Sequence, residues 1–275
     1  MTSLPSRPTP DVRVELRGAL PREEAEHARR RMLGLLDRLA PAGRPDPAVH
    51  SARVKLTRSR SSEVARPAIA QATLGLAGRK LRTQVAAVTM HQAVRLLHDR
   101  LLDRASRLRP YWEAPPDAAP PLDPDLCRPS REVADRPEYA RRTLGEREIV
   151  RRKSVRPARL TPQQAVLAMA GMDFDFHLFA DAVTGQDCLV HCQDPTGGYR
   201  IVRAGGAGQG GTTAGTAWSV AESLHPAPRI GVTEAARRLW LSGRPFVFFT
   251  GLRDGRGRIL YRRYDGHYGL IVPGQ

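Results

Sequence analysis

The residue types that bind metals come closest together in the sequence at Cys188-x-x-His191-Cys192. If this segment is a strand, its side chains alternate between two faces, so Cys188 and Cys192 share one face and His191 points to the other. Two thiolates do not complete a structural zinc site, which normally has four ligands. We therefore expect half-buried cysteines and no metal or cofactor. A metal site and a thiol redox switch stay open as less favoured alternatives.

The histidines form no catalytic group with a neighbouring nucleophile or acid. They are scattered along the chain at His27, His50, His91, His98, His177, His191, His225 and His267. His267 and Tyr268 are adjacent, but neighbours on a strand face opposite ways. The pattern predicts that the protein is not an enzyme.

A glycine-rich stretch at residues 203–217 contains Gly206-x-Gly208-x-x-Gly211, the spacing of a dinucleotide-binding loop. No helical pattern follows it, and no acidic residue stands at the distance that such a fold requires. We interpret the stretch as a flexible linker.

Charge is the strongest signal in the composition. The net charge of +16 and the pI near 11.0 favour a polyanionic partner, with nucleic acid ahead of membrane lipid. Residues 1–110 carry 22 Lys and Arg against 10 Asp and Glu, and so hold most of the excess. No apolar run approaches the roughly 20 residues of a membrane span, and residues 1–16 lack the apolar core of a signal peptide. We expect a cytoplasmic protein without a membrane partner.

Hydrophobic periodicity resolves residues 1–110 into strands and amphipathic helices. Strands are predicted at residues 11–18, 50–59, 68–78 and 80–88, and helices at 21–40 and 89–108. The order β-α-β-β-β-α predicts an α+β domain, a four-stranded sheet with both helices on one face.

The basic residues of this domain are expected to bind RNA phosphates, which guanidinium groups grip bidentately. The sequence has no zinc-finger spacing, homeodomain pattern or aromatic-rich strand for reading bases, so we expect recognition of a folded RNA by shape. The alternative is that these side chains only solubilise the surface. The candidate RNA-binding residues are Arg31, Arg38, Arg53, Lys55, Arg58, Arg60, Arg79, Lys80, Arg82, Arg100, Arg104 and Arg107.

Composition also places two linkers between three folded blocks. Residues 110–147 hold eight prolines and are predicted to form a semi-extended linker, spanning on the order of 35 Å as a loose coil. The predicted organisation is an RNA-binding domain at 1–110, a linker at 111–147, a first C-terminal copy at 148–203, a glycine-rich linker at 204–217 and a second copy at 218–275.

The two C-terminal copies align at an offset of 70 residues. The aligned pairs include Arg159 with Arg229, Ala165 with Ala235, Phe176 with Phe246 and Gly185 with Gly255. One deletion then brings Tyr199 onto Tyr268. Each copy is predicted to be a strand, a short helix and a three-stranded meander, so the sequence indicates a tandem duplication.

The segment FVFF, residues 246–249, is apolar on both faces if it is a strand. Such a strand needs cover on both sides. The helix predicted at 232–242 covers one side, and the other copy is the best cover for the second. We therefore expect the copies to pair within one chain. The aromatic residues expected at this pairing interface are Phe174, Phe176, Phe179, Tyr199, Phe246, Phe248, Phe249, Tyr261 and Tyr268.

These segments resemble a known family. YRRYDGHYGLIVP, residues 261–273, preceded by RPFVFF and a glycine-centred hairpin, closely resembles the C-terminal signature of long ribosome hibernation-promoting factors, also called sigma-54 modulation proteins. EREIVRRKSVRPARLTPQQAVLAMAGMDFDFHLF, residues 146–179, resembles the start of the same domain. The β-α-β-β-β-α block is similar to the N-terminal domain of that family.

The resemblance implies that the N-terminal domain binds the decoding region of the small ribosomal subunit, against 16S rRNA and the proteins near the mRNA channel. There it blocks mRNA and tRNA binding. It also implies that the C-terminal domain pairs between chains and joins two 70S ribosomes into a 100S particle. This chain departs from the family in having two C-terminal copies, and in having His91 and Arg95 where the family tends to have Tyr and an acid.

The resulting prediction is a monomeric hibernation factor of dormancy or stress that preserves single 70S ribosomes, because internally paired copies leave no surface for a second ribosome. The tether favours internal pairing, since some tens of residues give a roughly millimolar effective concentration. The alternatives are a homodimer that forms 100S particles, and a ribosome-independent RNA-binding or transcription-modulating protein.

Overall fold

The structure is a computed structural model that describes residues 11–39, 49–59, 64–76, 78–115, 120–124, 126, 139–140, 142–193, 198–205 and 220–274. The chain divides into two units, which we describe one at a time. The first unit holds residues 1–110, 131–137 and 171–173, and the second holds residues 111–130, 138–170 and 174–275.

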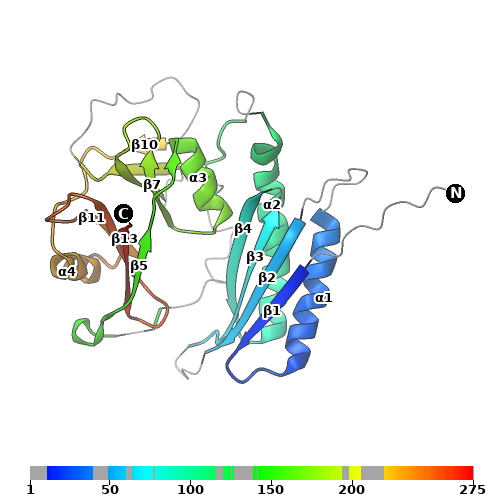
Figure 1. Ribbon diagram of the computed structural model, residues 1–275. Helices are drawn as coiled ribbons and strands as arrows, with labels where there is room; N and C mark the ends of the chain where they lie inside the picture. Colours follow the sequence, from blue (N-terminus) through cyan, green and yellow to red (C-terminus); the bar gives the residue numbers. More distant parts are fainter. Residues whose placement is uncertain are drawn as a thin grey trace. The chain divides into compact units, whose positions relative to one another are not determined.

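The first unit has a four-stranded sheet and two helices (Figure 1). Its elements are β1 (Asp11–Arg17), α1 (Arg22–Leu39), β2 (Val49–Arg58), β3 (Ala68–Leu76), β4 (Arg79–Ala87) and α2 (Met90–Glu113). The last residues of α2, from Tyr111 on, belong to the second unit. The sheet order is β1-β2-β3-β4, with β1 parallel to β2 and the other pairs antiparallel. The predicted α+β fold and the order of its elements are confirmed.

Alternation in the strands separates a buried face from an open one. In β2 the side chains of Ala52, Val54 and Leu56 are buried, while the intervening positions lie on the other face. The helices supply apolar stripes at helical spacing, and the α1 stripe ends in Leu39. The acidic first turn of α1 suits its helix dipole.

The second unit contains both C-terminal copies. Before the first helix of copy 1 come η3 (Leu144–Glu146), β5 (Ile149–Val155) and β6 (Arg159–Leu160). Copy 1 continues with α3 (Pro162–Gly171), β7 (Phe176–Asp181), β8 (Asp187–Cys192) and β9 (Tyr199–Arg203). Copy 2 consists of β10 (Val220–Glu222), α4 (Val232–Ser242), β11 (Phe246–Thr250), β12 (Gly257–Arg262) and β13 (Tyr268–Pro273).

The copies exchange their first strands. β5 begins copy 1 but pairs in parallel with β13 of copy 2, which completes the sheet β11-β12-β13-β5. β10 begins copy 2 but pairs in parallel with β9 of copy 1, which gives the sheet β10-β9-β8-β7-β6. Each exchanged strand therefore covers a sheet edge of the other copy, an edge that would otherwise present unpaired backbone groups.

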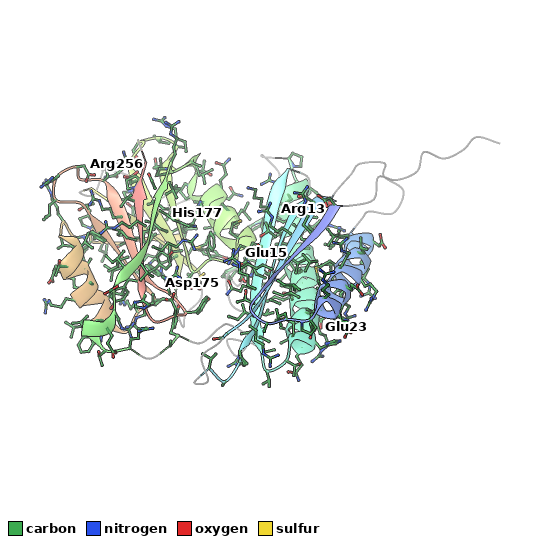
Figure 2. All side chains as sticks on the ribbon, turned by 60° about the horizontal axis from the view of Figure 1, so that its bottom comes forward. Arg13, Glu15, Glu23, Asp175, His177 and Arg256 are labelled. Carbon is green, nitrogen blue, oxygen red and sulfur yellow. The ribbon has the colours of Figure 1, made fainter. Side chains whose placement is uncertain are left out.

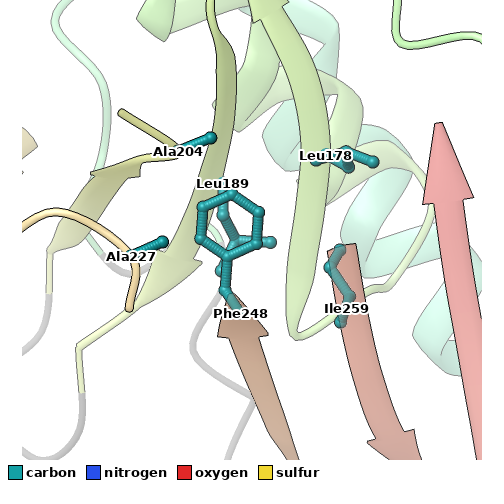
Figure 3. Packing of buried hydrophobic residues seen from close by; sticks show 6 residues of the cluster. All are labelled: Leu178, Leu189, Ala204, Ala227, Phe248 and Ile259. Atoms are coloured by element: carbon teal, nitrogen blue, oxygen red, sulfur yellow. The ribbon is translucent and has the colours of Figure 1, made fainter. Parts of the chain in front are cut away.

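The two sheets of this unit share a hydrophobic core. Leu178 and Leu189 from copy 1 pack with Phe248 and Ile259 from copy 2 (Figure 3). Copy 2 has a second core on the other side of its sheet, where Phe249 packs with residues of α4. The strand β11 is therefore covered on both faces, one by the other copy and one by its own helix.

Part of the proline-rich stretch packs against copy 1 instead of forming a loose coil. Leu122 and Leu126 are buried. The Tyr111 hydroxyl donates to the carbonyl of Pro121 at 2.9 Å, and the Tyr199 hydroxyl donates to the carbonyl of Asp123 at 2.6 Å. The prediction of a semi-extended linker is wrong for these residues, because the apolar side chains among the prolines supply enough burial to fix them.

Candidate RNA-binding face and pairing interface

The open face of the first unit's sheet is basic. Across the four strands, Arg13 lies beside Arg53, Arg53 beside Thr73 and Thr73 beside Arg82. The next row brings Glu15, Lys55, Gln71 and Gln84 together. In β1–β4 this face carries the basic residues Arg13, Arg17, Arg53, Lys55, Lys80 and Arg82 against the acidic Asp11 and Glu15.

The charge on this face acts on its one central carboxylate. Arg17 donates to Glu15 at 2.7 Å, and this hydrogen bond holds the pKa of Glu15 below its ordinary value. Lys55 and Arg53 lower the same pKa through their positive charge. Arg13 and Glu15 lie on the edge strand β1, where Figure 2 labels them. The face therefore favours anionic groups, of which phosphate is the best match for rows of Arg.

The sequence-derived set of basic residues divides between two sides of the unit. Arg53, Lys55, Lys80 and Arg82 lie together on the open sheet face. Arg58 and Arg79 are exposed at strand ends. Arg60 lies outside the described residues. Reasoning from the sequence missed Arg13 and Arg17, although their alternation with Val12, Val14 and Leu16 would have placed them on this face.

The helical arginines have different surroundings. On α1, Arg31 is half-buried and Arg38 is exposed, and this helix carries five Arg against four Asp and Glu, so its charge is mixed. On α2, Arg100 and Arg104 are buried and pair with Asp173, at 2.9 and 3.2 Å, while Arg107 is half-buried. Asp173 belongs to the first unit. The interpretation of Arg100 and Arg104 as RNA-binding residues does not fit this structure, because both side chains are buried and pair with the Asp173 carboxylate.

The aromatic residues expected at the pairing interface also divide into two groups. The rings of Phe176 and Phe246, equivalent residues of the two copies, lie 4.6 Å apart, and Tyr261 lies 6.1 Å from Phe176. Phe248 joins them between the sheets. Phe249 and Tyr268 instead pack beneath α4 in the core of copy 2.

The equivalents of these two residues in copy 1 are buried as well. Phe179 and Tyr199 have no exposed surface, and Tyr199 bonds the proline-rich segment. Phe174 is 38% exposed. The interface between the sheets is thus narrower than the sequence-derived set, because alternate residues of each strand face the copy's own helix side.

Cys188 is buried in the sheet of copy 1, and Cys192 is half-buried at the end of the same strand. Burial raises the pKa of Cys188 to about 12. Within the described residues, His, Cys, Asp and Glu form no group of three that could hold a metal ion. Among the same residues, no helix has the length and apolar character needed to cross a membrane.

Comparison with known proteins agrees with this architecture. Residues 145–201 and 220–270 each match the family described as "Sigma 54 modulation/S30EA ribosomal protein C terminus". A "Dormancy associated translation inhibitor" of Mycobacterium tuberculosis, from strains CDC 1551 and H37Rv, is 34% identical over 278 positions, which cover 98% of this chain and 90% of the relative.

A solved structure titled as a ribosomal subunit interface protein from Coxiella burnetii matches 36% of this chain and 97% of its own, at 16% identity and a TM-score of 0.28. On the strength of the family match and the full-length relative, this chain belongs to the sigma-54 modulation/S30EA ribosomal protein family. The resemblance drawn from its motifs is confirmed, and the duplicated C-terminal domain is matched in both copies.

Proposed function

We propose that this protein is a cytoplasmic ribosome hibernation factor that acts on single 70S ribosomes. Its N-terminal unit binds the decoding region of the small subunit, against 16S rRNA, and blocks mRNA and tRNA. The paired C-terminal copies do not recruit a second ribosome. Membership of the ribosomal protein family and a relative named as a dormancy-associated translation inhibitor support the ribosome as the partner.

The mutual coverage of the two sheets carries the monosome part of this proposal. Phe248 and Ile259 of copy 2 are 6% and 0% exposed because copy 1 packs on them within the same chain. A second chain would have to displace this contact and the exchanged strands before it could pair. The internal arrangement has the advantage of a high effective concentration.

Sedimentation tests this proposal directly. Purified protein is mixed with vacant 70S ribosomes and run through a sucrose gradient, and each fraction is blotted for the protein. We expect comigration with the 70S peak and no 100S peak. A 100S peak would refute the monosome proposal in favour of pairing between chains. Protein that stays at the top of the gradient would refute ribosome binding and favour free RNA as the partner.

The open sheet face is the surface that we propose for rRNA, supported by the cross-strand pair Arg13 and Arg53 and by Lys55 in the next row of β2. Changing all three to Ala is expected to weaken 30S binding by roughly 10- to 100-fold at physiological salt. The slope of log affinity against log salt concentration should also become less steep by roughly two to three.

A matched control changes exposed arginines on the helix side of the same unit. Arg29 and Arg30 of α1 are both exposed, and their replacement by Ala is expected to leave the salt dependence nearly unchanged. If the control variant loses as much affinity as the sheet variant, the sheet face is not singled out as the RNA-binding surface and this assignment is refuted.

A further inference from the structure

The turns β7–β8 and β11–β12 are structurally equivalent in the two copies. The amide of Asp181 donates to the carbonyl of Gln186 at 2.9 Å, and the amide of Gly251, 70 residues later, donates to the carbonyl of Arg256 at 3.0 Å. Gly185 and Gly255 occupy the same left-handed position, with φ of 70° and 62°.

Strand registers agree with this equivalence. Ala180 pairs with Asp187 in copy 1, and Thr250 pairs with Gly257 in copy 2. Asp187 and Gly257 are therefore the same position of the repeat.

These equivalent positions meet each other across the two copies, and their side chains are complementary. Asp187 is buried, with 4% of its side chain exposed. Its Oδ2 accepts from Nε of Arg256 at 2.7 Å and from the backbone amide of Gly257 at 2.9 Å, and its Oδ1 accepts from Nη2 of Arg256 at 3.3 Å. Copy 1 thus supplies the anion, and copy 2 supplies all three of these donors.

Copy 2 also leaves room for the Asp187 side chain, because its residue at the equivalent position is Gly257. A Cβ atom at Gly257 would lie 2.9 Å from the ring of Phe248 and 3.0 Å from Cβ of Asp187. Copy 1 has Leu178 where copy 2 has Phe248. The larger side chain therefore stands beside glycine in copy 2, whereas copy 1 has the smaller Leu178 and Asp187 at the two equivalent positions.

We propose that these residues restrict pairing to one copy of each kind, so that copy 1 recognises copy 2 and rejects another copy 1. Two copies 1 would bury two Asp187 carboxylates against each other, with Gln186 in place of the arginine. Two copies 2 would place two Arg256 side chains there without a carboxylate. The penalty falls on the pair of copies 1, because burying an uncompensated carboxylate costs far more than the net gain from a matched pair. The Arg256 side chain is 45% exposed, so a pair of copies 2 would lose the ion pair without burying a charge.

This inference rests on the internal pairing proposed above, and it names the partner that the interface accepts. That partner is a surface with arginine and glycine at the two repeat positions, which this chain provides in copy 2. Duplication of a self-pairing domain would first give two identical faces. The present differences turn these faces into a complementary pair.

The first test removes only the charge from copy 2. In the full chain, Arg256→Gln leaves Asp187 buried without its arginine and is expected to lower the folding equilibrium constant of the second unit by at least tenfold. The exposed neighbour Arg253 gives the matched control, and Arg253→Gln is expected to change it less than threefold. Urea unfolding followed by tryptophan fluorescence reports on this unit, because the described tryptophans, Trp112 and Trp240, both belong to it. Equal effects of the two variants would overturn the proposal.

The second test exchanges the two sides of the interface. Gly257→Asp gives copy 2 the carboxylate of copy 1 and is expected to lower the folding constant roughly 100-fold or more, whereas Gly145→Asp, at an exposed glycine with nothing within 4 Å, should be nearly neutral. The full exchange combines L178F, Q186R and D187G with F248L, R256Q and G257D. Its folding constant is expected to be at least tenfold higher than that of Gly257→Asp alone. An exchange variant no more stable than Gly257→Asp would overturn the proposal.

Failure of this inference is distinguishable from failure of the proposed function. Ribosome binding is read from the gradient and pairing selectivity from unfolding. A 100S peak with the wild-type chain would refute the monosome proposal, yet it would leave the selectivity intact, since two chains can pair copy 1 with copy 2 reciprocally.

Discussion

Two equivalent tyrosines in this protein are expected to respond in opposite ways to loss of their hydroxyl groups. Tyr199 of copy 1 and Tyr268 of copy 2 are both buried, at 0% and 1% exposure. The Tyr199 hydroxyl donates to the carbonyl of Asp123 at 2.6 Å, whereas the Tyr268 hydroxyl has no hydrogen-bond partner among the residues that the structure describes. Tyr→Phe at each position removes one oxygen and keeps the ring.

The magnitudes follow from the two environments. Tyr199→Phe loses a buried hydrogen bond and leaves the Asp123 carbonyl without this donor, which costs about 1–2 kcal/mol. Tyr268→Phe removes a buried hydroxyl that has no partner within the described part of the chain, so the free energy of unfolding of this variant should stay unchanged or rise by up to about 1 kcal/mol. Phe keeps the ring that the Arg147 guanidinium covers at 5.7 Å.

Urea unfolding of the full chain, followed by tryptophan fluorescence, measures both variants in the second unit. The expected order of stability is Tyr268→Phe at or above wild type and Tyr199→Phe below it. A thermal scan should show the melting temperature of Tyr199→Phe lowered by roughly 2–6 °C. If Tyr268→Phe is as destabilising as Tyr199→Phe, the two hydroxyls are equally well satisfied and the reasoning is refuted.

Three further outcomes are expected. Burial lowers the pKa of His177 below 6.5, so the unfolded chain takes up the proton first and stability falls below about pH 6.5; His177→Val, which copies Val247, should flatten this loss between pH 7.5 and 5.5 in urea unfolding, and an unchanged profile would contradict it. Because the pKa of Cys188 is raised to about 12, iodoacetamide should alkylate Cys192 at least about tenfold faster in the native protein, as read by peptide mass spectrometry; equal rates would mean that the sheet opens. Phe248→Ala should destabilise the second unit by about 3–5 kcal/mol, and a loss under about 1 kcal/mol in calorimetry would show that the sheets do not depend on it.

Much of the first unit could be predicted because its local patterns and its tertiary structure agree. The alternation of Ala52, Val54 and Leu56 defined the buried face of β2 and so placed Arg53 and Lys55 on the open one. The sequence pattern of a helix does not show which groups contact each of its faces. Arg100 and Arg104 share a flank of α2, but only the fold reveals that Asp173 reaches them.

The second unit was predicted in its elements and its pairing but not in its connections. The exchange of β5 and β10 has no local signal, because the copy in which a strand finds its parallel partner leaves the hydrophobic pattern of that strand unchanged. The prediction for the proline-rich stretch failed for a different reason. Its composition indicates an unpacked chain, while a few apolar residues such as Leu122 and Leu126 decide its structure.

The exchange of strands also determines the order in which the second unit can fold during its synthesis. β5 leaves the translating ribosome more than a hundred residues before its partner β13, a wait on the order of ten seconds at ordinary elongation rates. During that interval β5 has no sheet to join, and β9 of copy 1 waits for β10 in the same way. A nascent chain halted inside copy 2 beyond β10 has every strand of the sheet β10-β9-β8-β7-β6 but not of the sheet β11-β12-β13-β5, so this unit matures only after translation has passed through both copies.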